Sequence, residues 1–123
     1  MKKIGFITRN KVLVQSFCAA VEAKQEEIFQ ILPMLDYKQA ALDAQVLSID
    51  IAIVDGNQEI GTALQLCGQL RTSVPRCKIL FMVGQQSRAD MEIAVAAKRS
   101  GRIHDFLFYD ASLDYLIAKL SSM

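Results

Sequence analysis

The stretch that decides the fold is IDIAIVD, residues 49–55, an apolar run that ends in one aspartate, Asp55. Because the run does not alternate regularly between apolar and polar residues, we expect a strand that is buried on both faces, as in a parallel sheet. Gly56 and Asn57 follow at once and indicate a turn. The stretch therefore predicts a buried strand that delivers one carboxylate to a turn.

Strand-like and helix-like segments alternate on both sides of this stretch. Short apolar runs bounded by turn-forming residues predict strands, and apolar residues spaced three and four apart predict helices. Strands are predicted over 3–8, 27–32, 49–55, 78–83 and 105–109, and helices over 11–24, 36–46, 62–71, 87–101 and 113–120.

Residues that favour helix and strand ends mark several of these boundaries. Side-chain caps predict where helices begin, glycine predicts where one ends, and proline predicts the end of a strand. Asn10 is the predicted N-cap of the first helix, and the predicted capping boxes are Asp36 with Gln39 and Thr62 with Gln65. The fourth helix is predicted to begin at Ser87 and Asp90 and to end at Gly101. The second strand is predicted to end at Pro33.

Five strands and five helices in strict alternation predict the architecture. Helix-length crossovers between apolar strands imply parallel pairing with right-handed connections. We therefore expect an α/β fold of flavodoxin-like type, a doubly wound three-layer sandwich with a five-stranded parallel sheet of order 2-1-3-4-5.

Composition limits the classes of function. The chain has 123 residues, 52% of them apolar, and a formal net charge of +1. This length suits one domain over residues 1–123, and the composition excludes disorder. So small a charge provides no field for nucleic acid or anionic membrane, and no apolar run reaches the roughly 18–20 residues of a membrane span. We expect neither a nucleic-acid partner nor a membrane partner for this domain.

The thiols and the imidazole argue against redox, metal or hydrolytic chemistry. Cys18, Cys67 and Cys77 have no CxxC spacing, and His104 is the one histidine of the chain. Nothing near His104 in the sequence suggests a catalytic triad, and the turn TRNK (8–11) lacks the glycines of phosphate-binding loops. We expect a cytoplasmic protein that is not an enzyme, with binding of a small ligand or nucleotide as an open alternative.

The chain resembles a response-regulator receiver domain of two-component signalling, the CheY-like family, from about Lys3 to Leu120. Asp55 falls at the phosphorylated aspartate of that family, and the spacing from Asp55 through LQLCGQLR (64–71) matches the family pattern without a gap. DFLFYDASLDYLIAKL (105–120) resembles the last strand and helix of the family, with Phe106 at its aromatic switch position.

The family's chemical motifs are kept less well than its layout. Of the residues that perform phosphotransfer in receivers, Asp55 alone is present. Thr8 and Arg9 replace the acidic pair that binds Mg²⁺, Val83 replaces a Ser or Thr, Tyr109 and Asp110 replace a Lys and the Pro that usually follows it, and Gln58 and Glu59 replace a Met-Pro pair.

These replacements predict an atypical receiver, or pseudo-receiver. Phosphoryl transfer to a carboxylate needs a cation to neutralise the developing charge, and Mg²⁺ prefers several oxygen ligands. We therefore expect no cofactor and no catalytic residue at this site. An ion pair between Arg9 and Asp55 would hold the domain in one state without phosphate, and the alternative is that Arg9 points to solvent. The second hypothesis is a working acceptor, with Mg²⁺ bound by Asp55, helped by Asn10 or Asn57, and a histidine kinase as phosphate donor.

The resemblance also implies a partner surface. Receivers commonly bind partners or dimerise through the fourth helix, fifth strand and fifth helix. In this chain that switch and partner face would carry Phe106, Tyr109 and Tyr115, with Met91, Val95 and Lys119 around them. The sequence ends with KLSSM (119–123), where a linker to an output module would begin in this family, so a longer parent chain is an open alternative.

Overall fold

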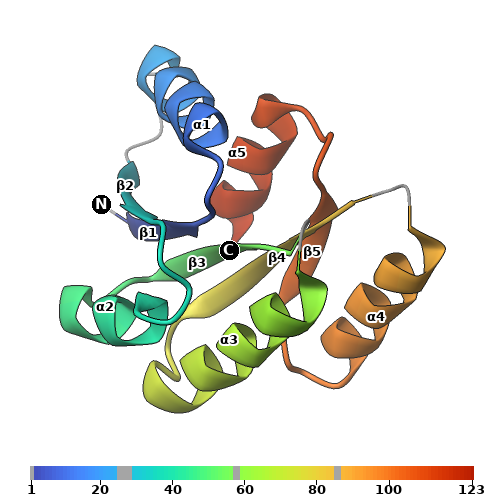
Figure 1. Cartoon of the computed structure of the whole chain (residues 1–123). Coiled ribbons are helices and arrows are strands. Elements are labelled where there is room, and N and C mark those ends of the chain that lie inside the picture. Colours follow the sequence, from blue (N-terminus) through green and yellow to red (C-terminus); the bar gives the residue numbers. More distant parts are fainter. Residues whose placement is uncertain (1, 25–28, 57–58, 85–86) are drawn as a thin grey trace.

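The computed structural model describes residues 2–24, 29–56, 59–84 and 87–123. Strands and helices alternate along the chain, and the helices cover both faces of a central sheet (Figure 1). The elements in order are β1 (Lys2–Ile7), α1 (Lys11–Ala23), β2 (Phe29–Met34), α2 (Ala40–Leu47), β3 (Ile51–Asp55), α3 (Ile60–Ser73), β4 (Lys78–Val83), α4 (Arg88–Arg99), β5 (Asp105–Phe108) and α5 (Leu113–Ser122).

The sheet has the predicted order β2-β1-β3-β4-β5, and every pair of neighbouring strands is parallel. β1 and β3 lie next to each other, with Ile7 opposite Val54. The chain turns to β2 on one side of β1 and to β4 on the other side of β3. This is the switch point at which doubly wound sheets place their ligands.

Two apolar layers hold the helices to the sheet. On one face, Phe17 of α1 and Leu120 of α5 pack with Phe6 of β1, and all three side chains are fully buried. On the other face, small and apolar residues of α2, α3 and α4 pack against side chains such as Phe81 of β4. Figure 1 shows this division, with α1 and α5 on one side of the strands and α2 and α3 on the other.

Three predicted helix ends are confirmed. The Asn10 side chain accepts a hydrogen bond from Leu13 N at 3.0 Å, and Ser87 Oγ accepts one from Asp90 N at 3.2 Å. Gly101, after the end of α4, has φ of +80°, a conformation that favours glycine. None of the described helices is long and apolar enough to cross a membrane.

The predicted end of the second strand is wrong. Pro33 lies inside β2, opposite Phe6, and the strand continues to Met34. β2 is an edge strand, so a residue without an N–H is tolerated there. Residues 27 and 28, where this strand was predicted to begin, lie outside the described residues.

Both predicted capping boxes are also wrong. α2 begins one turn later than expected, with Gln39 at its N-cap and no side-chain cap. Asp36 instead accepts a hydrogen bond from Lys38 N in the preceding turn. α3 begins earlier than expected, after Glu59, and Thr62 lies inside its first turn, where its hydroxyl donates to the Glu59 carboxylate at 3.1 Å.

Candidate functional site

A cavity of about 210 Å³ opens at the carboxyl edge of the sheet, between the ends of β1, β3 and β5. Parallel strands bring their carboxyl ends to one edge, so residues far apart in the sequence meet there. The residues that line the cavity are Arg9, Asn10, Tyr37, Asp55, Glu59, Thr62 and Tyr109. The predicted site residues Arg9, Asp55 and Tyr109 are therefore brought together.

Asp55 is half-buried at the end of β3, and Thr8 contacts its carboxylate. The comparison with receiver domains counted Thr8 only as the replacement of an acidic residue. The fully buried Thr8 hydroxyl donates a hydrogen bond of 2.7 Å to Asp55 Oδ2. The same hydroxyl oxygen accepts a hydrogen bond from Asn10 N at 3.0 Å. A hydrogen-bonded chain thus runs from the start of α1 through Thr8 to the carboxylate, and each bond polarises the next.

Tyr37 is a site residue that the sequence analysis missed. It lies in the turn after β2, and its hydroxyl donates to the Asp55 carbonyl oxygen at 2.6 Å, with the Ile7 carbonyl oxygen 3.3 Å away. Burial first, and the nearby Asp55 charge second, raise the pKa of Tyr37, so the hydroxyl keeps its proton and remains a donor. Tyr37 therefore ties the ends of β1 and β3 together beneath the cavity.

Arg9 is exposed and lies above the Tyr37 ring, with the guanidinium carbon 5.3 Å from the ring centroid. This distance is typical of a cation–π contact. Arg9 and Asp55 share the cavity, and the ion pair between them stays a prediction. The guanidinium is thus held on the cavity wall by an aromatic ring.

Asn10 joins the start of α1 to the end of β5. While its side-chain oxygen caps the helix at Leu13 N, its Nδ2 donates to the Tyr109 hydroxyl oxygen at 2.6 Å. Tyr109 is itself positioned by its backbone N–H, which donates to the Val83 carbonyl oxygen at 2.9 Å. Tyr109 therefore presents to the cavity a hydroxyl group whose position is fixed by the Asn10 amide.

The oxygen ligands for a metal ion are few. Within the described ranges, no group of three or more His, Cys, Asp and Glu side chains is arranged to hold a metal ion. Asp55 and Glu59 supply the carboxylates of the cavity, and Val83 is fully buried without a hydroxyl. Asn57, a predicted helper for Mg²⁺, lies outside the described residues.

The predicted switch and partner face contains a cluster of charges. The Asp105 carboxylate at the start of β5 binds Lys119 Nζ of α5 at 2.7 Å and Lys98 Nζ of α4 at 3.0 Å. Burial raises the pKa of Asp105, but the hydrogen bonds from Lys119 and Lys98 outweigh it and lower the pKa overall. Phe106 packs partly into the core, and Tyr115 is 53% exposed. Asp105 was not predicted, although its position between two lysine-bearing helices follows from the alternation of elements.

The cysteines are free thiols, and two of them are buried. Burial is the main cause that raises the pKa of Cys67 to about 12 and that of Cys77 to about 11. Because the thiolate is the reactive form, these thiols are poor nucleophiles and poor redox groups.

Solved structures with the same arrangement of elements include two response regulators. The one from Clostridium difficile is 21% identical in sequence, with a TM-score of 0.79 over 99% of this chain and 94% of that chain. The one from Thermotoga maritima is 16% identical, with a TM-score of 0.80 over 99% of this chain and 96% of that chain.

A third similar structure belongs to a novel family of streptococcal redox sensors that evolved from two-component response regulators. It is 13% identical, with a TM-score of 0.79 over 99% of this chain and 50% of that chain. No family model matches the sequence, and no curated protein matches it significantly. The protein thus has the CheY-like receiver fold of two-component response regulators.

Proposed function

We propose that this protein is a receiver-like signalling domain that acts through protein contact, without Mg²⁺-dependent phosphorylation of Asp55 and without enzymatic turnover. The fold and the position of Asp55 at the end of β3 support a role in two-component signalling. The free thiols support a reducing, cytoplasmic setting.

The observation that carries the proposal is the hydrogen bond from Thr8 to Asp55. The hydroxyl proton points at Asp55 Oδ2 across 2.7 Å, from a side chain that is fully buried. A Mg²⁺ ion bound to the same lone pair of Asp55 Oδ2 would have to break this hydrogen bond. Thr8 has no negative charge that could serve as a second carboxylate ligand of the ion. Mg²⁺ is usually held by one or two carboxylates together with waters and phosphate, so the lost acidic pair weakens the site directly.

The other replacements act on the transferred phosphoryl group. Electrostatic stabilisation by preorganised groups is usually the largest contribution to such catalysis. The Tyr109 hydroxyl is neutral where receivers have an ammonium, and Val83 brings no hydroxyl. We expect phosphotransfer to Asp55 to be orders of magnitude slower than in a receiver that keeps these groups.

Intact-mass analysis after incubation with acetyl phosphate and Mg²⁺ tests the proposal. We expect no mass gain in the natural sequence. The matched positive control is a variant that restores the family's groups at four positions, Thr8→Asp, Arg9→Asp, Val83→Thr and Tyr109→Lys, and it should gain one phosphoryl mass. A gain in the natural sequence that disappears in Asp55→Asn would overturn the proposal.

That last outcome would support the second candidate, a working acceptor that takes its phosphoryl group from a histidine kinase. The observation in its favour is that Asp55 lines an open cavity, so an incoming phosphate donor has access to it. Mg²⁺ would then be required, with Asp55 and waters as its ligands.

An Arg9–Asp55 ion pair would explain how one state is held without phosphate. A double-mutant cycle with Arg9→Ala and Asp55→Ala tests this pair separately from phosphotransfer. We expect a coupling free energy of about 0.5 kcal/mol or more in urea denaturation. A coupling of zero would mean that Arg9 acts on Tyr37 alone.

The partner surface proposed for this domain is the switch and partner face of α4, β5 and α5, which binds a protein partner or a second copy of the chain. The exposed Tyr115 ring, with Lys119 Nζ 5.5 Å from its centroid, presents an aromatic group beside a cation. Aromatic residues are enriched in protein interfaces. Sedimentation over a range of concentrations should show self-association that Tyr115→Ala weakens and that Val46→Ala, an exposed apolar control on α2, does not. Equal effects of the two variants would exclude this face.

A further inference from the structure

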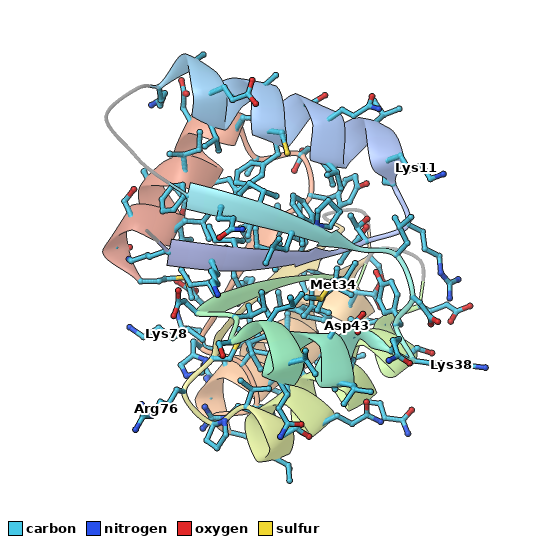
Figure 2. The ribbon with its side chains drawn as sticks, turned by 90° about the vertical axis from the view of Figure 1, so that its left-hand side faces the viewer. Lys11, Met34, Lys38, Asp43, Arg76 and Lys78 are labelled. Carbon is cyan, nitrogen blue, oxygen red and sulfur yellow. The ribbon has the colours of Figure 1, made fainter. Side chains whose placement is uncertain are left out.

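A group of basic side chains lies at the amino edge of the sheet, on the side opposite the Asp55 cavity. Arg71 lies near the end of α3, Lys78 begins β4, and Arg102 and His104 lie in the turn before β5. Figure 2 shows Arg76 and Lys78 extending from the same side of the molecule, away from Lys11 and Lys38 at the other edge. The function proposed above makes no use of this edge.

His104 is held in a defined orientation by the backbone of β4. The backbone N–H of Ile79 donates to the ring nitrogen Nδ1 of His104 at 2.9 Å, and the backbone N–H of His104 donates to the Ile79 carbonyl oxygen at 3.0 Å. A backbone N–H in a strand cannot turn away, so Nδ1 must offer a lone pair to it. In the neutral imidazole the proton therefore lies on Nε2.

Arg71 then faces His104 donor to donor. Arg71 Nη1 lies 3.1 Å from His104 Nε2, and a guanidinium has no acceptor. In the other neutral tautomer the ring proton lies on Nδ1, where it would face the Ile79 N–H, so two donors would still oppose each other. Burial first, and the Arg71 and Lys78 charges next, lower the pKa of His104, so the neutral form prevails near neutral pH. Two N–H donors thus lie 3.1 Å apart, and an oxygen acceptor that bound beside them would satisfy both.

We propose that Arg71 and His104 form a carboxylate-binding surface, the Arg71–His104 surface, that binds an acidic, Asp- and Glu-rich segment of a partner protein. One carboxylate accepts from both donors, as in bidentate recognition, because its two oxygens match a pair of neighbouring N–H groups. The Lys78 charge also acts on His104, while Lys78 Nζ donates a hydrogen bond to the Met123 carbonyl oxygen. Arg76 and Arg102 are exposed in the turns at the same edge of the sheet.

An acidic protein segment fits this surface better than nucleic acid does. The formal net charge of the whole chain is only +1, so the basic residues make a local patch without a long-range field for a polyanion. The recognition element is also a single pair of donors, which suits one carboxylate at a time. Because the surface lies at the edge opposite Asp55, the two proposals succeed or fail independently.

NMR titration of the ¹⁵N-labelled chain with acetylated hexaglutamate amide tests the surface. His104 gives the one imidazole signal of the chain, so the assignment is unambiguous. We expect saturable shifts of the His104 ring and the Ile79 amide at low-millimolar peptide, weaker in high salt. A bound carboxylate should also raise the pKa of His104, because a nearby negative charge favours the imidazolium.

Matched variants separate this surface from general charge attraction. Arg71→Gln should weaken peptide binding about fivefold, the upper range for an exposed charge pair. Arg88→Gln removes the same charge from a 92% exposed side chain on α4 and should leave binding unchanged. Equal losses in both variants, no shift of His104, or tighter binding of a short single-stranded oligonucleotide than of the peptide would each overturn the proposal.

Discussion

Replacement of Gly56 by alanine probes how closely the packing beneath the Asp55 cavity is fitted. Gly56 directly follows Asp55, and its N–H donates to the Met82 carbonyl oxygen at 2.9 Å. A Cβ on Gly56 would lie 2.3 Å from Cζ and 2.8 Å from Cε2 of the Phe81 ring, where ordinary contacts begin at 3.4 Å. The ring is fully buried in the layer formed with α2, α3 and α4, so it has nowhere free to move.

The magnitude follows from that overlap. The ring or the strand would have to shift by about 1 Å, and inserting one methyl group into a packed core costs about 1–3 kcal/mol. We expect Gly56→Ala to lower the free energy of unfolding by this amount. The melting temperature should fall by about 4 °C for each kcal/mol in a domain of this size.

Urea denaturation of four variants isolates the cause. Gly68→Ala is the matched control, because a Cβ on this α3 residue meets nothing within 4 Å, and it should stabilise by about 0.5–1 kcal/mol through helix propensity. Phe81→Leu removes the clashing ring atom, so Gly56→Ala should cost at least about 1 kcal/mol less in that background. If Gly56→Ala is as stable as the natural sequence, or costs the same with Phe81→Leu, the close approach of Gly56 and Phe81 is refuted.

Three further predictions concern single side chains. Thr8→Val keeps the buried shape but removes the hydroxyl, so urea denaturation should show a loss of about 1–3 kcal/mol, and unchanged stability would contradict its hydrogen bonds. Because the pKa of His104 is lowered on folding, the unfolded chain binds its proton at higher pH. Stability should therefore fall as the pH drops below about 6.5, with a slope that His104→Asn removes. The pKa of Asp105 is also lowered on folding, because the hydrogen bonds from Lys119 and Lys98 outweigh the effect of burial, so its contribution to stability is likewise lost as the pH falls. Asp105→Asn should therefore cost about 1 kcal/mol near pH 7 and progressively less in acid, and a pH-independent cost would exclude the charge as its cause.

The fold could be predicted because the apolar runs are long and the helical periods clear. The five strands lie where those runs lie, and Asn10 and Ser87 begin helices because a side-chain oxygen there accepts a free N–H. The end of β2 was mispredicted because proline is unusual inside a strand, except in a strand at the edge of a sheet. The sequence alone does not show that β2 is an edge strand, whereas the order of the sheet does.

The site was harder to predict, because its contacts depend on where the side chains at the strand ends point, and the local sequence does not determine this. Thr8 counts as a loss in a motif comparison, yet its buried hydroxyl is directed at Asp55. Tyr37 was missed because Asp36 was predicted to open a helix, which placed Tyr37 in the first turn of that helix, whereas the structure places it in the turn between β2 and α2. With the end of β2 placed at Met34, a tyrosine three residues later would have indicated a hydroxyl at the carboxyl edge of the sheet, close to Asp55.

The division of the core into two layers has a consequence for how the chain is made. Ile4 and Phe6 of β1 leave the ribosome before the other four strands of the sheet, yet the apolar layer that covers them includes Leu116 and Leu120 of α5. The opposite layer needs nothing beyond Phe108. During synthesis the face toward α1 therefore stays open until α5 emerges, so chaperones and proteases would meet that face after all residues of the other layer have been made.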